Sequence, residues 1–178
     1  MSPNLDNGNN VDHASTSEIV EKWFHDHIQH HAKPKLTKLH FFVHDNVIAD
    51  NPTSVLIAPA NTDNIASIAF GSTYAMDAPI TLDSDPSSEL IGRAQGTFTF
   101  AGQAEPVLSM VINLVITEGD FKRSSISILG NNPISHDYRE MPILGGTGVF
   151  RMACLQWIPS LLTLQNDILE YHAIIQHY

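Results

Sequence analysis

Residues 39–45 read LHFFVHD, and the side chains of this stretch alternate in character from one position to the next. Leu39, Phe41 and Val43 fall on one face of an extended chain, while the histidines fall on the other. Because successive side chains of a strand point to opposite faces, the alternation predicts a β-strand with one face in a core.

The rest of the chain repeats this pattern between turn-forming residues such as Asn51-Pro52 and Gly145-Gly146. The further predicted strands are residues 54–58, 67–75, 90–100, 106–118, 124–129, 148–157 and 167–177, and the first strand is widened to 36–44. About eight strands with short connections predict an all-β fold, an eight-stranded antiparallel β-barrel just wide enough for one small ligand.

Residues 107–116 carry apolar side chains on both faces of their predicted strand. A strand of this kind is covered on both sides. One face fills the barrel, and the other favours a homo-oligomer. The alternative is that the N-terminal helix covers the outer face within one chain.

The N-terminal segment differs in composition from the barrel. Residues 1–17 are polar and predict a flexible tail, and Ser17 to His31 has apolar residues near helical spacing with Ser17 as its expected N-cap. Pro34 ends this helix. The predicted organisation is therefore residues 1–35, a tail and short helix, followed by residues 36–178, the barrel domain.

The net charge of −10 argues against a nucleic-acid partner and against an anionic membrane surface, because both require a surplus of Lys and Arg. No apolar run is long enough to span a bilayer. Four histidines crowd the helix, but their pattern matches no known zinc spacing, so a solvated face is the favoured interpretation and no metal is expected; they are His25, His27, His30 and His31.

Asp45 is in phase with the apolar face of its strand and lies near the strand end. A carboxyl there would sit in the barrel or at its mouth, where desolvation favours the uncharged acid that can donate a proton. The alternative is an Asp that caps the following turn through Asn46, and the spacing leaves both open. By composition alone, Arg139 is predicted to be a surface ion-pair residue.

Several motifs resemble the plant dirigent family, in the family's order and from about Leu36 to Tyr178. They are LHFFVHD at 39–45, FGS at 70–72, MDAPIT at 76–81, GRAQG at 92–96 and REMPILGGTGVF at 139–150. The resemblance implies an eight-stranded barrel, usually a homotrimer, that acts on small phenolic radicals or quinone methides without a metal or organic cofactor. It also implies secretion to the apoplast, for which a signal peptide must have been removed, because residues 1–11 do not have the pattern of one.

The resemblance further assigns roles to five residues. Asp45 matches the family's pocket aspartate, and Arg139 matches the arginine before the Gly-Gly-Thr-Gly turn. Phe98 and Phe100 match barrel-lining aromatic positions, although they replace tyrosines. Asn132 stands where lignan-forming members carry a second aspartate, and the terminal cysteines of those members are absent.

These departures favour an enzyme similar to pterocarpan synthases, a hydro-lyase that dehydrates and cyclises an isoflavanol. Asp45 would protonate the benzylic hydroxyl, Arg139 would hold a phenolate-like oxygen, and Asn132 would orient a phenol. The alternative is a non-enzymatic dirigent protein that orients monolignol radicals made by a separate oxidase during lignan formation.

Overall fold

The computed structural model describes residues 15–26, 33–60, 70–137, 139–153, 160–163 and 168–178. In chain order the elements are α1 (Thr16–Phe24), β1 (Lys35–His44), β2 (Ser54–Ala58), β3 (Thr73–Thr81), β4 (Leu90–Phe100), β5 (Val107–Ile116), β6 (Ser124–Pro133), β7 (Ile143–Thr147), the 3₁₀ turn η3 (Gly148–Phe150), β8 (Ser160–Thr163) and β9 (Ile168–His177). The chain divides into two compact units, Met1–Lys33 and Pro34–Tyr178.

Helix α1 begins with a capping box. The Ser15 hydroxyl accepts a hydrogen bond from the Glu18 amide at 3.3 Å, and the Glu18 carboxylate accepts one from the Ser15 amide at 2.7 Å. This reciprocal pairing satisfies two backbone donors at the helix start. The predicted N-cap, Ser17, is therefore wrong by two residues, and the part of the predicted helix at 27–31 lies outside the described residues.

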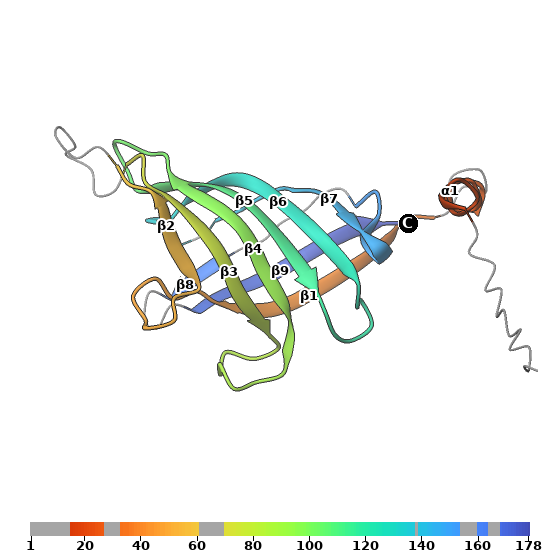
Figure 1. Ribbon diagram of the computed structural model, residues 1–178, viewed down its shortest axis with the longest axis horizontal. Coiled ribbons are helices and arrows are strands. Elements are labelled where there is room, and N and C mark those ends of the chain that lie inside the picture. Colours follow the sequence, from red (N-terminus) through yellow and green to blue (C-terminus); the bar gives the residue numbers. More distant parts are fainter. Residues whose placement is uncertain (1–14, 27–32, 61–69, 138, 154–159, 164–167) are drawn as a thin grey trace, which may run out of the picture. The chain divides into compact units, whose positions relative to one another are not determined.

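The strands of the second unit form one antiparallel sheet that curls nearly into a closed barrel (Figure 1). Its hydrogen-bonded path runs β7-β6-β5-β4-β3-β1-β9-β8, and β2 pairs with β3 outside this path. The predicted fold, an eight-stranded antiparallel β-barrel with a short N-terminal helix, is thereby confirmed. The pairing of β1 with β9 joins the two ends of the barrel unit, from Lys35 opposite His177 to His44 opposite Ile168.

Inward-facing side chains from every long strand line the barrel. The buried apolar residues include Phe41, Val43, Met76, Ala78, Ile80, Ala94, Ile112, Leu114, Ile126, Ile128, Ala173 and Ile175. The alternation expected of residues 107–116 is visible in β5, where Leu114 is buried and Val111 on the other face is 48% exposed.

The structure corrects several of the predicted strands. Strand β6 continues through residues 130–133, expected to be a turn, because each of them pairs with β5. The strand expected at 148–157 is wrong over its described part, which forms η3 and a turn. The strand in this region is β7, which ends before residue 148. The strand expected at 67–75 starts at Thr73 within the described residues and runs on to Thr81, and β8 was not predicted.

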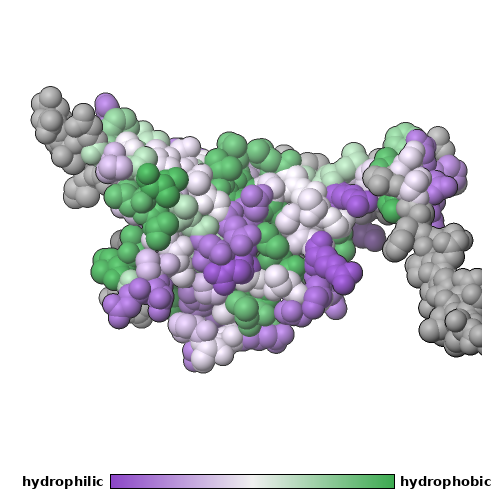
Figure 2. Space-filling view, in the orientation of Figure 1, coloured by the Kyte–Doolittle hydropathy of each residue, from purple (hydrophilic) through white to green (hydrophobic). Residues whose placement is uncertain are grey.

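The surface carries a group of exposed apolar side chains near the end of β1. Figure 2 shows hydrophobic residues gathered over β2 and the loop before it. We call this group the apolar rim; it consists of Val47, Ile48, Val55, Leu56 and Ile57. Among the described helices, none has the length and apolar character needed to cross a bilayer.

Candidate functional site

Asp45 follows directly after β1 and is partly buried. Its Oδ1 accepts hydrogen bonds from the hydroxyls of Thr53, at 2.9 Å, and Ser54, at 2.6 Å. The turn that follows is held by Asn46, whose Oδ1 accepts hydrogen bonds from two backbone amides at 2.9 Å. Asp45 is thus fixed by hydroxyls at the start of β2, and its Oδ2 has no partner among the described residues.

Arg139 is buried, with 1% of its surface exposed, so the prediction of a surface ion pair is wrong. One terminal nitrogen donates a hydrogen bond to Asn132 Oδ1 at 3.2 Å. Within the described part of the chain, its Nε and its other terminal nitrogen have no partner. Burial lowers the pKa of Arg139 from its ordinary value, while the nearby Tyr171 acts to raise it. A guanidinium retains its charge at physiological pH, so two donors of a buried cation remain for another group.

Asn132 connects this arginine to the barrel wall. It is 4% exposed and lies on the inward face of β6, opposite Leu108 of β5. Its side-chain nitrogen donates to the Met110 sulfur at 3.1 Å. The extension of β6 beyond residue 129 therefore places this amide inside the barrel, where Arg139 Nη1 donates to its oxygen.

Tyr171 is a site residue that sequence analysis did not single out. It is 4% exposed and stacks on Phe41, its opposite residue in the β1–β9 ladder, with ring centroids 5.4 Å apart. Burial raises the pKa of Tyr171 from 10.0 to about 12; the positive charge of Arg139 opposes this shift and the negative charge of Asp45 adds to it. Tyr171 is therefore a neutral phenol within electrostatic range of both predicted catalytic residues.

Three aromatic rings gather at one end of β3 and β4. Tyr74 stacks on Phe98 with centroids 5.1 Å apart, and Phe100 meets Phe98 edge-on at 6.4 Å. Phe98 is opposite Met110 in the β4–β5 ladder, and Met110 is the residue that accepts the hydrogen bond from Asn132. The rings thus adjoin the polar residues on the inner wall. Tyr74 was not predicted as a member of this group.

A cavity of about 200 Å³ lies toward the opposite end of β4 from the aromatic rings. Its lining includes Leu39, Phe41, Ile91, Ile116 and Phe121, and none of the five predicted site residues. Asp45 is the one carboxylate among the five predicted site residues, so these residues make a poor metal site, because metal ions require several electron-donating ligands.

The sequence and the fold are similar to those of known proteins. Residues 36–175 match the family model described as "Dirigent-like protein". Dirigent protein 21 of Arabidopsis thaliana is 40% identical over 151 residues, covering 83% of this chain and 80% of that protein. Pterocarpan synthase 1 of Glycine max is 41% identical over 149 residues, covering 81% of this chain and 80% of that protein.

A solved structure, that of the pterocarpan synthase dirigent protein GePTS1, is similar over the barrel. It superposes with a TM-score of 0.74 at 37% identity and covers 83% of this chain and 87% of that chain. Both the sequence match and the shared architecture extend over most of the protein. The chain therefore belongs to the dirigent family.

Proposed function

We propose that this protein dehydrates an isoflavanol and closes the resulting quinone methide to a pterocarpan with one stereochemical outcome. The observation that carries the proposal is the buried Arg139 guanidinium, bonded to Asn132 and close to the neutral Tyr171, with two nitrogens that lack partners among the described residues. A buried cation in this state is costly unless a ligand supplies the missing acceptors. A phenolic oxygen that gains negative charge is such an acceptor.

Each group would have one task. Asp45 Oδ2 would donate a proton to the benzylic hydroxyl, which leaves as water, while Arg139 would hold the phenolic oxygen whose proton is lost as the quinone methide forms. The phenol of the second ring would then attack the benzylic carbon. The proton lost by the first phenol would restore the acid form of Asp45. As the ether bond forms, the second phenol would lose its proton and the quinone-methide oxygen would gain one, so the only net product besides the pterocarpan is water.

Stereochemical control needs little energy. A hundredfold preference for one face of the intermediate corresponds to about 2.7 kcal/mol between competing transition states. One hydrogen bond and one ring contact are sufficient for a difference of this size. Asn132 and Tyr171 provide the polar groups, the rings of Tyr74, Phe98 and Phe100 provide a stacking surface, and the apolar rim provides an entrance suited to an aromatic substrate.

A second candidate function is supported by the similarity to Dirigent protein 21, which equals that to the pterocarpan synthases. In this alternative the protein is not an enzyme and orients two monolignol radicals made by a separate oxidase. The Asn132 amide argues against it. The resemblance implies that lignan-forming members of the family carry an acid at this position.

One experiment separates the two functions. The protein is incubated with racemic isoflavanol alone and, separately, with coniferyl alcohol and a one-electron oxidant, and products are resolved by chiral chromatography. We expect optically enriched pterocarpan in the first incubation. Enrichment only in the oxidant-dependent incubation would favour the radical-orienting function and overturn our proposal.

We further propose that the protein is a homotrimer that acts after secretion into the plant apoplast. The support for the trimer is the family resemblance together with outward apolar side chains on adjacent strands: Val111 and Leu129 are opposite each other and each is 48% exposed. The support for secretion is the resemblance alone. Fractionation of plant tissue that expresses the tagged protein tests the location, and intracellular retention would contradict it.

A further inference from the structure

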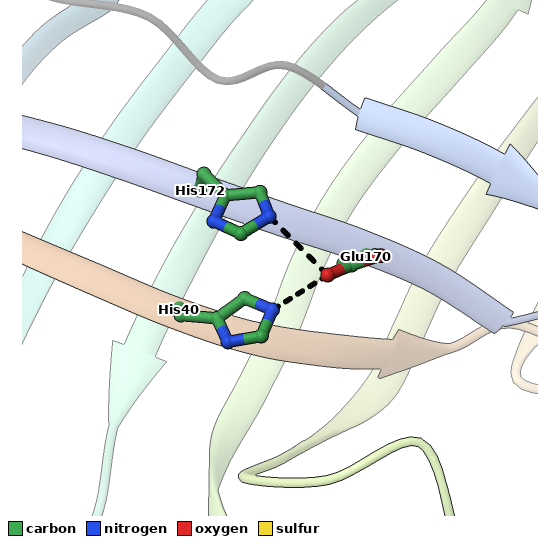
Figure 3. Close-up of side chains that lie close together, drawn as sticks. All are labelled: His40, Glu170 and His172. Atoms are coloured by element: carbon green, nitrogen blue, oxygen red, sulfur yellow. Dashed lines mark hydrogen bonds and ion pairs between the residues drawn. The ribbon is translucent and has the colours of Figure 1, made fainter.

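Two histidines and a glutamate come together on the outer face of β1 and β9, away from the predicted site (Figure 3). His40 Nε2 lies 2.7 Å from Glu170 Oε1, and His172 Nε2 lies 3.2 Å from the same oxygen. The two imidazole rings stack with centroids 4.3 Å apart and planes 4° from parallel. Three groups of the type that bind transition metals therefore point to one spot.

We propose that His40, Glu170 and His172 form a binding site for a Zn²⁺-class divalent cation. Two imidazoles and one carboxylate are a known zinc ligand set that leaves a coordination position open. One donor atom from each residue lies within 4.8 Å of the others. Tetrahedral zinc with bonds of about 2.0–2.1 Å places its ligand atoms about 3.3 Å apart. The separation between Glu170 and His172 has this value, and the contact between His40 and Glu170 must open by roughly half an ångström.

The backbone holds these ligands in place. His40 is directly opposite His172 in the β1–β9 ladder, and Glu170 is two residues from His172 on the same face. The ring of Phe42 packs against His40 with centroids 5.1 Å apart, which limits rotation of the imidazole. A site on paired strands is more precise than one on loops. The strands would hold the backbone in place, while the two stacked rings would turn so that the in-plane lone pair of each nitrogen is directed at one ion.

Access and charge also favour a cation. The side chains of His40, Glu170 and His172 are 44%, 28% and 38% exposed, so an ion reaches them from solvent. The ring nitrogens that now approach the carboxylate must give up or relocate a proton to bind metal. Imidazole nitrogens favour zinc, copper and nickel over calcium and magnesium, which prefer sites made of oxygen ligands.

A bound ion would link the first and last strands of the barrel. Tyr171 lies between Glu170 and His172 in β9, on the opposite, buried face. Metal binding would thus brace the strand segment that holds Tyr171, and it would stabilise the folded barrel by mass action. The proposal stands independently of the reaction inside the barrel, because its readouts are binding and stability.

The test is titration of the full chain with Zn²⁺ by calorimetry, combined with thermal unfolding with and without Zn²⁺. We expect saturable binding at this site and a higher unfolding midpoint with the metal. His172→Gln and Glu170→Gln should each weaken this binding at least about tenfold, the loss typical even of groups that only orient metal ligands. Their unfolding midpoints without metal should match the unsubstituted protein, which shows that they fold.

Two control variants separate this site from other histidines. His136→Gln removes an exposed histidine that pairs with Glu105 at 3.4 Å, and no second imidazole of the described residues joins this pair. This variant should bind Zn²⁺ normally. A variant with glutamine at all four N-terminal histidines should keep the stabilising site; the positions are His25, His27, His30 and His31. The proposal is overturned if the unsubstituted protein shows no saturable binding, or if His172→Gln and Glu170→Gln bind as tightly as it does.

Discussion

Arg139 combines near-complete burial with a guanidinium that the described protein atoms only partly satisfy. A buried unpaired donor costs stability in a structure selected for folding alone. Retention of such a group is typical of a site in which a ligand completes the hydrogen bonds. At the scale of single residues, burial with unsatisfied donors distinguishes Arg139 from the many polar side chains at the surface.

Replacing Arg139 with methionine separates the effect of this residue on the stability of the protein from its effect on function. Arg139→Met keeps a similar length without the charge, so we expect the free energy of unfolding in urea to rise by about 1–3 kcal/mol, while pterocarpan formation is lost. Arg93→Met is the control, since Arg93 forms an exposed ion pair with Asp77, and its effect should stay within about 0.5 kcal/mol. A marked destabilisation by Arg139→Met would instead make Arg139 a structural residue.

Tyr171 should dominate the loss of folding stability at alkaline pH. Its raised pKa, about 12 in the barrel against 10.0 when unfolded, means that the folded state keeps the phenol proton more tightly. This contribution, roughly 3 kcal/mol, is fully present below pH 10 and is lost as the pH rises through about 12.

Ultraviolet absorbance of tyrosinate during alkaline titration measures this effect. We expect the last titration step to disappear in Tyr171→Phe, and we expect that variant to lose less stability than the unsubstituted protein between pH 10 and 12. If Tyr171 titrates near pH 10 instead, the phenol is not in the buried environment described above.

The site residues differed in how far sequence analysis could predict them. The phase of Asp45 with Phe41 predicts a place on the apolar face of the strand, inside the barrel or at its mouth, and the spacing leaves a cap of the following turn as an equal alternative. The burial of Arg139 was not predictable from its charged neighbours, because sequence neighbours do not show which side chains a residue contacts in the fold, here the inward-facing Asn132. Tyr171 was predictable in principle, since it alternates with Ala173 and Ile175 on the buried face of β9.

At the scale of elements, β4 and β5 approach closely at a glycine. A side chain added at Gly96 would place its Cβ 2.0 Å from the Val111 carbonyl oxygen and 2.9 Å from the Ile112 Cα. Both contacts are with backbone, which cannot move without breaking the ladder between the strands. Gly96 therefore sets the spacing of the wall that carries Phe98.

Gly96→Ala should destabilise the barrel by at least about 2 kcal/mol, because one strand must shift from its partner. Gly145→Ala is the matched control: nothing lies within 4 Å of a Cβ added there, so its effect should stay within about 0.5 kcal/mol. Denaturant unfolding of both variants measures the difference. Equal stabilities would show that β4 and β5 are not as closely paired as described.

Strands were predicted well where alternation was strong and poorly where composition imitated a turn. β2 and β4 have the predicted bounds. The Gly-Asn-Asn-Pro residues at 130–133 suggest a turn, yet they continue β6 because the apolar partner β5 extends alongside them. Tertiary pairing overrode local propensity there, which is typical of strands.

At the scale of the whole molecule, the proposed trimer would place the outer face of β5 and β6 in its interface. Val111 and Leu129 are adjacent across the ladder and half exposed in the single chain. Leu129→Glu would place a charge in the proposed interface, so we expect a monomer by analytical ultracentrifugation in place of the trimer. Leu90→Glu, at an exposed position at the start of β4, should leave the trimer intact. A trimer that persists in Leu129→Glu would exclude this face.

The central claim is that Asp45 acts as the acid inside the barrel, and Asp45→Asn tests it most directly. Asparagine keeps an oxygen that can accept the hydrogen bonds of Thr53 and Ser54, so the variant should unfold at the same midpoint. It has no proton to donate as an acid, so the rate of pterocarpan formation from isoflavanol, followed by chiral chromatography, should fall at least about a hundredfold. A folded Asp45→Asn variant that dehydrates isoflavanol at the full rate would contradict the account.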